Sequence, residues 1–309
     1  MKSVLQDFEA MATALNANPD YRVLRRVRPR AIINPDDGAE KRLAVIVDTE
    51  TTGLDTEKDE IISLAMAQVE YSPQTGKLYR VLDAFEEYRE PSRPIPVEVT
   101  ALTGITNEMV QGRSIDIERV LAMVMSSVLV IAHNADFDRR VLERFHPVFF
   151  DKGWACTHSD LPWADEQCGS SKLEYLACRY GFFHDGHRAL NDVLAVVEML
   201  AGPLPVSRGS TMLALLEAAR RPSFRIQVFD APFERKDLLK TERRFRWFPG
   251  SAALRKHWHK DVAESDLAEE LAFLKSRVFE RPVDIPVTRL TAKTRFSDHA
   301  RGHAVDDGA

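Results

Sequence analysis

The pattern of apolar and polar positions predicts a sheet in the first half of the chain. Residues 43–50 begin with a continuous apolar run, which is typical of a central strand covered on both faces. Residues 60–71 and 78–90 show two further strand patterns on either side of the turn sequence SPQTGK. We expect these three segments to form an antiparallel meander, and residues 127–134 to form another buried strand.

Helical spacing of apolar residues fills much of the sequence between and after these strands. Asn134 is expected to cap the helix that follows it, and Gly202 with Pro203 to end a later one. Strands followed by alternating helices and strands indicate an α/β sheet with helices on both faces. The predicted helical segments are 99–112, 114–126, 135–145, 170–182, 188–202, 209–222 and 266–279.

Composition changes along the chain and divides it into four predicted segments. Residues 1–40 hold a short amphipathic helix and a basic stretch, 21–30, which could be an extra strand, a nucleic-acid contact or a solvated face. Residues 41–203 carry the α/β sheet, residues 204–290 predict a small α+β module, and residues 291–309 predict a flexible tail.

The predicted C-terminal module is basic and rich in aromatic residues. From Arg221 to Lys260 there are eleven Lys and Arg against four Asp and Glu, whereas the whole chain has a net charge of −5. Interleaved cations and aromatic rings suit single-stranded nucleic acid, although most such rings form the core of a small domain. The aromatic residues are Phe224, Phe229, Phe233, Phe245, Trp247, Phe248 and Trp258.

The whole chain predicts a cytoplasmic protein with a packed core. It has 309 residues, 44% of them hydrophobic, and neither a secretory signal nor an apolar run long enough to cross a membrane is visible. The odd number of cysteines (Cys156, Cys168 and Cys178) favours free thiols. A zinc site with His158 is the alternative, but the usual paired Cys spacing is missing.

Two acids at the end of the first predicted strand raise a question of charge. Asp48 and Glu50 are two residues apart, so on a strand they share one face and repel each other. A solvated turn is one explanation. A hard divalent cation, Mg²⁺ or Mn²⁺, held between the carboxylates is the other.

Partners for these acids stand near other predicted element ends. Asp138 and Asp192 fall in the first turns of two helices, and His187 precedes the second helix. Four acids can hold two divalent cations, with Asp48 bridging them, and such a pair suits phosphodiester hydrolysis. His187 titrates near neutrality and is predicted to take the proton of the attacking water.

The segments VDTETTGL, AHNADFD and HRALND resemble the three motifs of the DEDDh exonucleases, in the same order and with the His-x₄-Asp spacing. That family includes the proofreading epsilon subunit of bacterial DNA polymerase III. The resemblance, over about residues 40–203, implies a ribonuclease-H-like fold with a mixed five-stranded sheet. It also implies that the five catalytic positions are filled and that four further residues serve the substrate site: Thr51, Gly53, Leu54 and Asn134.

These observations predict a metal-dependent 3′→5′ exonuclease that releases nucleoside monophosphates from single-stranded nucleic acid, DNA before RNA. A polymerase or repair partner is possible and a membrane is not expected. The alternatives are an exoribonuclease of the same family and a catalytically silent binding or scaffold protein; a missing ligand would favour the latter, and none is missing. His133 and His184 are expected to be structural. The segment KGWACTHSDLPW departs from the family pattern after the second motif.

Overall fold

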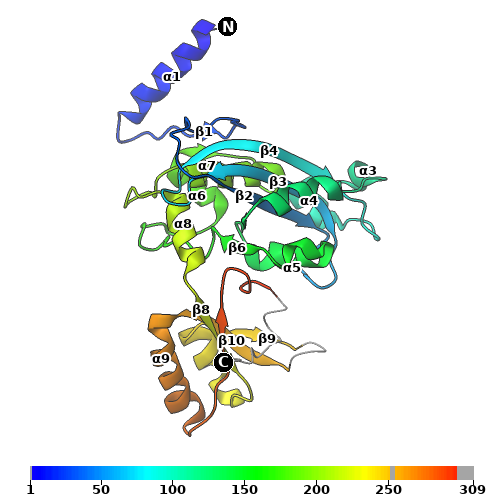
Figure 1. The fold of residues 1–309 in the computed structure, drawn as a ribbon, viewed down its shortest axis with the longest axis vertical. Coiled ribbons are helices and arrows are strands. Elements are labelled where there is room, and N and C mark those ends of the chain that lie inside the picture. The colour runs from blue at the N-terminus through cyan, green and yellow to red at the C-terminus, as the bar shows by residue number, and fades with distance from the viewer. Residues whose placement is uncertain (1, 251–254, 298–309) are drawn as a thin grey trace.

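A mixed five-stranded sheet is the centre of the computed structural model, which describes residues 2–250 and 255–297 (Figure 1). The strand order is β4-β3-β2-β5-β6. β2 pairs antiparallel with β3 and β3 with β4, whereas β5 and β6 continue the sheet in parallel with β2. The predicted mixed sheet and its meander are therefore confirmed. The strands are β2 (Arg42–Thr51), β3 (Ile61–Tyr71), β4 (Leu78–Tyr88), β5 (Leu129–Ala132) and β6 (Gly153–Cys156).

The apolar run of β2 is continuous because helices cover both faces of the sheet. Ala44 and Ile46 pack in one hydrophobic cluster, and Val45 and Val47 pack in a second cluster on the other face. The first cluster joins α6 (Leu173–Tyr180), α7 (Ala189–Ala201) and α8 (Thr211–Arg220) to the sheet. The second joins α4 (Ile117–Ser126) and α5 (Ala135–Phe145). The short helices α2 (Val97–Thr103) and α3 (Asn107–Val110) follow β4, and a 3₁₀ turn spans Pro147–Phe149.

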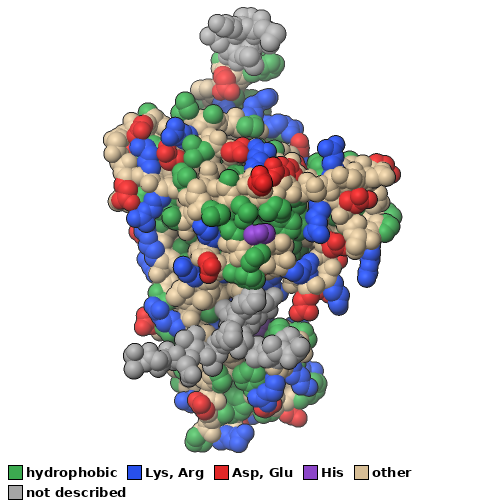
Figure 2. Space-filling view, turned by 45° about the vertical axis from the view of Figure 1, so that its right-hand side comes forward, with side chains coloured by type: hydrophobic (Ala, Val, Ile, Leu, Met, Phe, Trp, Pro, Cys, Tyr) green, Lys and Arg blue, Asp and Glu red, His purple; other side chains and the backbone are tan. Residues whose placement is uncertain are grey.

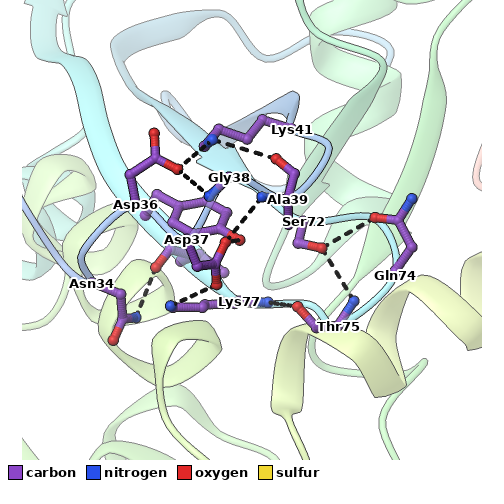
Figure 3. Close-up of polar contacts among 12 residues, drawn as sticks. Asn34, Asp36, Asp37, Gly38, Ala39, Lys41, Ser72, Gln74, Thr75 and Lys77 are labelled. Carbon is purple, nitrogen blue, oxygen red and sulfur yellow. Dashed lines mark hydrogen bonds and ion pairs between the residues drawn. The ribbon is translucent and has the colours of Figure 1, made fainter.

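The N-terminal extension consists of a helix and a strap along the sheet domain. Helix α1 (Lys2–Asn16) projects from the body of the protein (Figure 1). The basic stretch after it contains a short strand, β1 (Arg25–Arg26), parallel to β7 (Phe182–Phe183). Figure 3 shows the following turn held to the β3–β4 hairpin, where the Asp37 carboxylate accepts hydrogen bonds from Lys77 and from the Tyr79 hydroxyl.

The C-terminal module contains a four-stranded antiparallel sheet with its own hydrophobic core. The strand order is β11-β8-β10-β9, and residues such as Ile226, Val228 and Leu274 form the core. Phe245 is buried, whereas Phe233 is 74% and Trp247 is 48% exposed. The elements are β8 (Ser223–Val228), β9 (Arg246–Phe248), β10 (His257–Ala263), α9 (Glu264–Phe273) and β11 (Val287–Leu290). A 3₁₀ turn spans Phe233–Arg235, and π-helical segments span Leu238–Glu242 and Leu274–Phe279.

Two predicted segment boundaries differ from the structure. The sequence places residues 204–222 in the C-terminal module, but Met212 and Leu215 of α8 are fully buried in the cluster that also contains the five-stranded sheet. Residues 291–297 were expected in a flexible tail, but they return to the sheet domain, where the Trp154 N–H donates to the Ala292 carbonyl at 2.8 Å. The remainder of the predicted tail, 298–309, lies outside the described residues.

The returning segment docks through a buried arginine. Arg139 on α5 is 1% exposed and donates to the Lys293 carbonyl at 2.7 Å and to the Arg295 carbonyl at 2.8 Å. Its Nε lies 2.6 Å from the Glu143 carboxylate, which also accepts a hydrogen bond from Ser297. Charge pairing and backbone hydrogen bonds together satisfy this buried guanidinium. The segment therefore ties the end of the small module to the sheet domain.

The described residues include no helix that is long and apolar enough to cross a membrane. The three cysteines are free thiols, and Cys156 is buried at the end of β6.

Candidate active site

The end of β2 brings the first two predicted acids together with a third. Asp48 and Glu50 lie on the face of β2 that α7 covers, and Asp192 lies in the first turn of α7. One carboxylate oxygen of each lies within 4.8 Å of the other two. The ladder between β2 and β3 shifts its register after Glu50, so regular pairing ends where the acids cluster.

Asp138 reaches the same region from the opposite face of the sheet. It lies in the first turn of α5 and is 3% exposed. Its Oδ1 accepts hydrogen bonds from the Thr49 N–H at 3.1 Å and from the Thr49 hydroxyl at 2.9 Å. Thr49 points away from Asp48 along the strand, so it anchors Asp138 beside the three clustered acids. The structure thus brings together all four acids predicted from the sequence.

Burial and mutual repulsion strongly perturb these carboxyl groups. Burial first, and then the charges of Asp138, Asp192 and Glu50, raise the pKa of Asp48 well above its ordinary value. Burial first, and then the charges of Asp192, Asp138 and Glu86, raise the pKa of Glu50 to about 7. Burial raises the pKa of Asp138 to about 7, against the lowering effect of its hydrogen bonds from Thr49. The four acids therefore carry excess negative charge that protons or cations must offset.

The donor set suits hard divalent cations. Carboxylate oxygens are the preferred ligands of Mg²⁺ and Mn²⁺, and their mutual repulsion is relieved when a cation lies between them. The group of potential ligands found in the described residues contains only carboxylates, without the thiols or imidazoles typical of a zinc site. The residues present therefore fit the predicted cations.

A further acid, Glu86, belongs to the site and was missed in the sequence. It lies on β4, and its charge contributes to the raised pKa values of Asp48 and Glu50. Its Oε1 accepts a hydrogen bond from the Ser63 hydroxyl at 2.9 Å. The β-sheet register aligns Asp48 with Ala65 and Ala65 with Glu86, a relation that spacing along the chain does not reveal.

The predicted catalytic histidine lies at the edge of the cluster. The backbone N–H of His187 donates to the Asp192 carboxylate at 3.0 Å, and the residue has a left-handed φ of 58°. Its imidazole is 51% exposed, with Nε2 3.9 Å from the Glu174 carboxylate. The imidazole therefore points toward solvent and is accessible to an incoming substrate.

The other two histidines differ from each other. His133 is partly buried and lies between the Thr157 hydroxyl and the Ser171 carbonyl, both at 2.9 Å, and the loss of solvent around its imidazole lowers its pKa to about 4. It is a neutral structural histidine, as expected. The His184 side chain is 2% exposed, and its Nε2 lies 2.8 Å from the Asp192 carboxylate. His184 therefore contacts the acid cluster directly, which the sequence analysis did not anticipate.

The residues expected to meet the substrate surround the end of β2. The Thr51 hydroxyl donates to the Gly53 carbonyl, and a Cβ at Gly53 would lie 2.5 Å from the Asp59 carboxylate. Leu54 is 89% exposed, so its apolar side chain is open to a ligand. Asn134 stands at the N-cap position of α5, as predicted, but its side chain makes no capping hydrogen bond.

A five-stranded sheet in this order, with clustered carboxylates at the end of its central strand, defines a hydrolase of the ribonuclease-H-like class. Within that class the chain belongs to the exonuclease family of the RNase T type, whose family model matches residues 45–200. The predicted family resemblance is therefore confirmed. Residues 45–200 are therefore the part of the chain that the exonuclease family accounts for.

Named relatives agree with this assignment. The chain is 31% identical over 163 residues to the DNA polymerase III subunit epsilon of Aquifex aeolicus, covering 50% of this chain and 77% of that protein. It is 30% identical over 173 residues to the PolC-type DNA polymerase III of Thermotoga petrophila, covering 53% of this chain but only 12% of that protein. Among solved structures, exonuclease X in complex with 5′ overhanging duplex DNA is similar at 26% identity and a TM-score of 0.39, covering 55% of this chain and 99% of that one.

Proposed function

We propose that the protein removes nucleotides from the 3′ end of single-stranded DNA, with two divalent cations, and releases nucleoside 5′-monophosphates. The observation that carries this proposal is the acid cluster: Asp48, Glu50 and Asp192 within 4.8 Å of one another, with Asp138 held beside them. A buried group of like charges is costly unless cations or protons neutralise it. Bound cations would offset this cost, and they would explain why four acids are placed together.

Each acid has a proposed role that follows from its position. Asp48 would bridge two cations, Glu50 and Asp192 would complete one of them, and Asp138 would help to hold the other. When bound, such cations polarise a phosphate and increase the acidity of water. The His187 imidazole would take the proton of the attacking water. The oxygen of that water would bond to phosphorus while the bond between phosphorus and the 3′ oxygen breaks. The 51% exposure of this imidazole leaves it free to turn toward the scissile phosphate.

Thr51, Gly53, Leu54 and Asn134 are proposed to receive the terminal nucleotide. The exposed Leu54 would contact the base or sugar. DNA is favoured over RNA because the named relatives are DNA polymerase III proteins. For the same reason a polymerase or repair partner remains part of the proposal.

Parallel digestion of end-labelled single-stranded DNA and RNA tests the proposal. With Mg²⁺ or Mn²⁺ we expect progressive shortening from the 3′ end, and with EDTA none. A 3′-terminal phosphate should slow digestion, and a blocked 5′ end should not. Faster digestion of RNA would favour the exoribonuclease alternative. Equal cutting of circular single-stranded DNA would refute the exonuclease assignment, and inactivity of the folded protein on every substrate would favour a silent binding protein.

A further inference from the structure

A cleft with a volume of about 530 Å³ lies between the sheet domain and the C-terminal module. Its sheet-domain wall includes Asn134 and Asp136 at the start of α5, and His158 just after β6. The module supplies the opposite wall from β8, β10 and the residues before β9. Figure 1 shows the module below the α5 and β6 side of the larger sheet, as these walls require.

The cleft and the acid cluster share one edge of the sheet. β2, β5 and β6 are parallel, so their carboxyl ends reach the same edge. Asp48 and Glu50 stand at the end of β2, and the cleft begins at the ends of β5 and β6. The register places Cys156, at the end of β6, one residue short of the level of Asp48. With strands about 4.8 Å apart, two strand spacings put Cys156 roughly 10 Å from Asp48. A strand with its 3′ end at the acids can therefore continue into the cleft.

Positive charge predominates in the cleft although the whole protein is acidic. Six lining residues are Lys or Arg and three are Asp. Elsewhere, acidic and basic side chains are interspersed, as one face shows in Figure 2. Two of the six cations are paired with acids of the cleft: Arg225 with Asp261 at 2.7 Å, and Arg295 with Asp160 at 2.9 Å. These pairs and the docking of residues 291–297 give the cleft firm walls.

Three exposed arginines in the cleft have no short ion pair among the described residues. Arg221 and Arg246 have acids only at 3.9 Å, from Glu217 and Asp136 respectively, and their side chains are 79% and 77% exposed. Arg244 is exposed beside them. Arg246 belongs to the module but faces the sheet domain, because its guanidinium lies 3.9 Å from the carboxylate of Asp136 on α5. Guanidinium groups with unused donors, projecting into a cleft, suit phosphate.

We propose that this cleft binds the phosphodiester backbone of the single strand upstream of the 3′ end, through Arg221, Arg244 and Arg246. The inference rests on the proposed function, because it takes the acid cluster as the place of the 3′ end. Apart from histidines, Phe296 is the one aromatic residue among those that line the cleft, so stacking of bases on aromatic rings contributes little there. Recognition is therefore of charge and not of base sequence, and binding depends on salt and on strand length.

The test compares three proteins in EDTA, where nothing is hydrolysed. Binding of a labelled single strand of about 20 nucleotides is measured by fluorescence anisotropy at several salt concentrations. The cleft variant carries Arg221→Gln, Arg244→Gln and Arg246→Gln. The matched control carries the same loss of charge on the same module, at exposed positions outside the cleft: Lys240→Gln, Lys275→Gln and Arg277→Gln.

We expect the cleft variant to bind roughly tenfold more weakly and its salt slope to fall by about 2, which is roughly 0.7 for each lost phosphate contact on a single strand. The control should retain the wild-type slope. The loss should be much smaller for a dinucleotide, whose single phosphodiester would lie at the acids and leave none for the cleft. Equal affinity and slope in the cleft and control variants would overturn the inference, as would an equal loss for blunt duplex DNA.

The two proposals fail in different assays. If the wild type does not digest any strand with Mg²⁺, the proposed function is wrong, whatever the binding data show. If digestion is normal but the cleft variant binds like the control, only the cleft assignment is wrong. Should the triple variant unfold, the three single variants decide the matter, because each is expected to lower the slope by about 0.7.

Discussion

Replacing Asp48 with Asn removes one charge from the acid cluster and preserves the shape of the side chain. Asp48 is surrounded by the charges of Asp138, Asp192 and Glu50, which raise its pKa in addition to the larger effect of burial. We expect Asp48→Asn to abolish hydrolysis, because a carboxylate needed for cation binding is lost. We also expect the variant to be more stable than the wild type when cations are absent.

The size of the second effect follows from the geometry. Two unit charges 4.8 Å apart repel by about 3.5 kcal/mol at an effective dielectric constant of about 20. The wild type avoids part of this cost by retaining protons on its carboxyl groups. We therefore expect the free energy of unfolding of Asp48→Asn to exceed that of the wild type by less than this, about 1–3 kcal/mol. For a protein of this size that gain corresponds to a rise in Tm of roughly 2–4 °C per kcal/mol.

The gain depends on pH in a defined direction. The pKa of Glu50 is raised to about 7 in the folded state, against about 4.3 in an unfolded chain. Between these values the folded protein binds more protons than the unfolded one, so cation-free stability falls as pH rises. Asp48→Asn removes one source of this repulsion, so its stability advantage over the wild type should be larger at about pH 8 than at about pH 5.

Thermal unfolding in EDTA, and again with Mg²⁺, provides the assay. The wild type should gain stability on Mg²⁺ addition at pH 8, and Asp48→Asn should gain much less. Asp83→Asn is the matched control, because Asp83 lies on β4 but pairs with Arg119 at 2.8 Å outside the cluster. Asp83→Asn should show no cation-free stabilisation and should keep the Mg²⁺ response. A cation-free Asp48→Asn protein no more stable than the wild type at pH 8, with an intact Mg²⁺ response, would refute the reasoning.

Three further predictions concern other parts of the structure. His187→Gln should lower kcat by about 10²–10⁴ and keep the Mg²⁺-dependent rise in Tm, because its imidazole lies outside the acid cluster; loss of that rise would contradict its role as a base. Arg139→Met should destabilise the protein by about 3–5 kcal/mol in urea unfolding, because Glu143 then stays buried without its partner; an unchanged midpoint would contradict the docking role of residues 291–297. Gly53→Ala should raise KM more than it lowers kcat in steady-state digestion, because the added Cβ displaces Asp59; unchanged KM would separate this loop from the substrate.

The sequence by itself determined the local features of the site. The apolar run before Asp48 specifies a doubly covered strand, and the two-residue spacing places Glu50 on the same face. The turns before Asp138 and Asp192 are ordinary helix starts, so both acids could be placed at element ends. These inferences succeed because, within one strand or helix, the spacing of residues along the chain determines the directions of their side chains.

Only the tertiary structure decided which distant groups meet. Glu86 joins the site through strand register, and His184 reaches Asp192 while the imidazole of His187 faces solvent. Residues 291–297 return to the sheet domain, where the buried guanidinium of Arg139 donates to carbonyls more than 150 positions later in the chain. No local pattern in the sequence encodes a contact over that separation. The basic cleft likewise exists only because residues of the sheet domain and of the module line the same hollow. Contacts between residues far apart in the sequence depend on how the helices and strands pack together. That packing is determined by the need to bury both faces of the sheet.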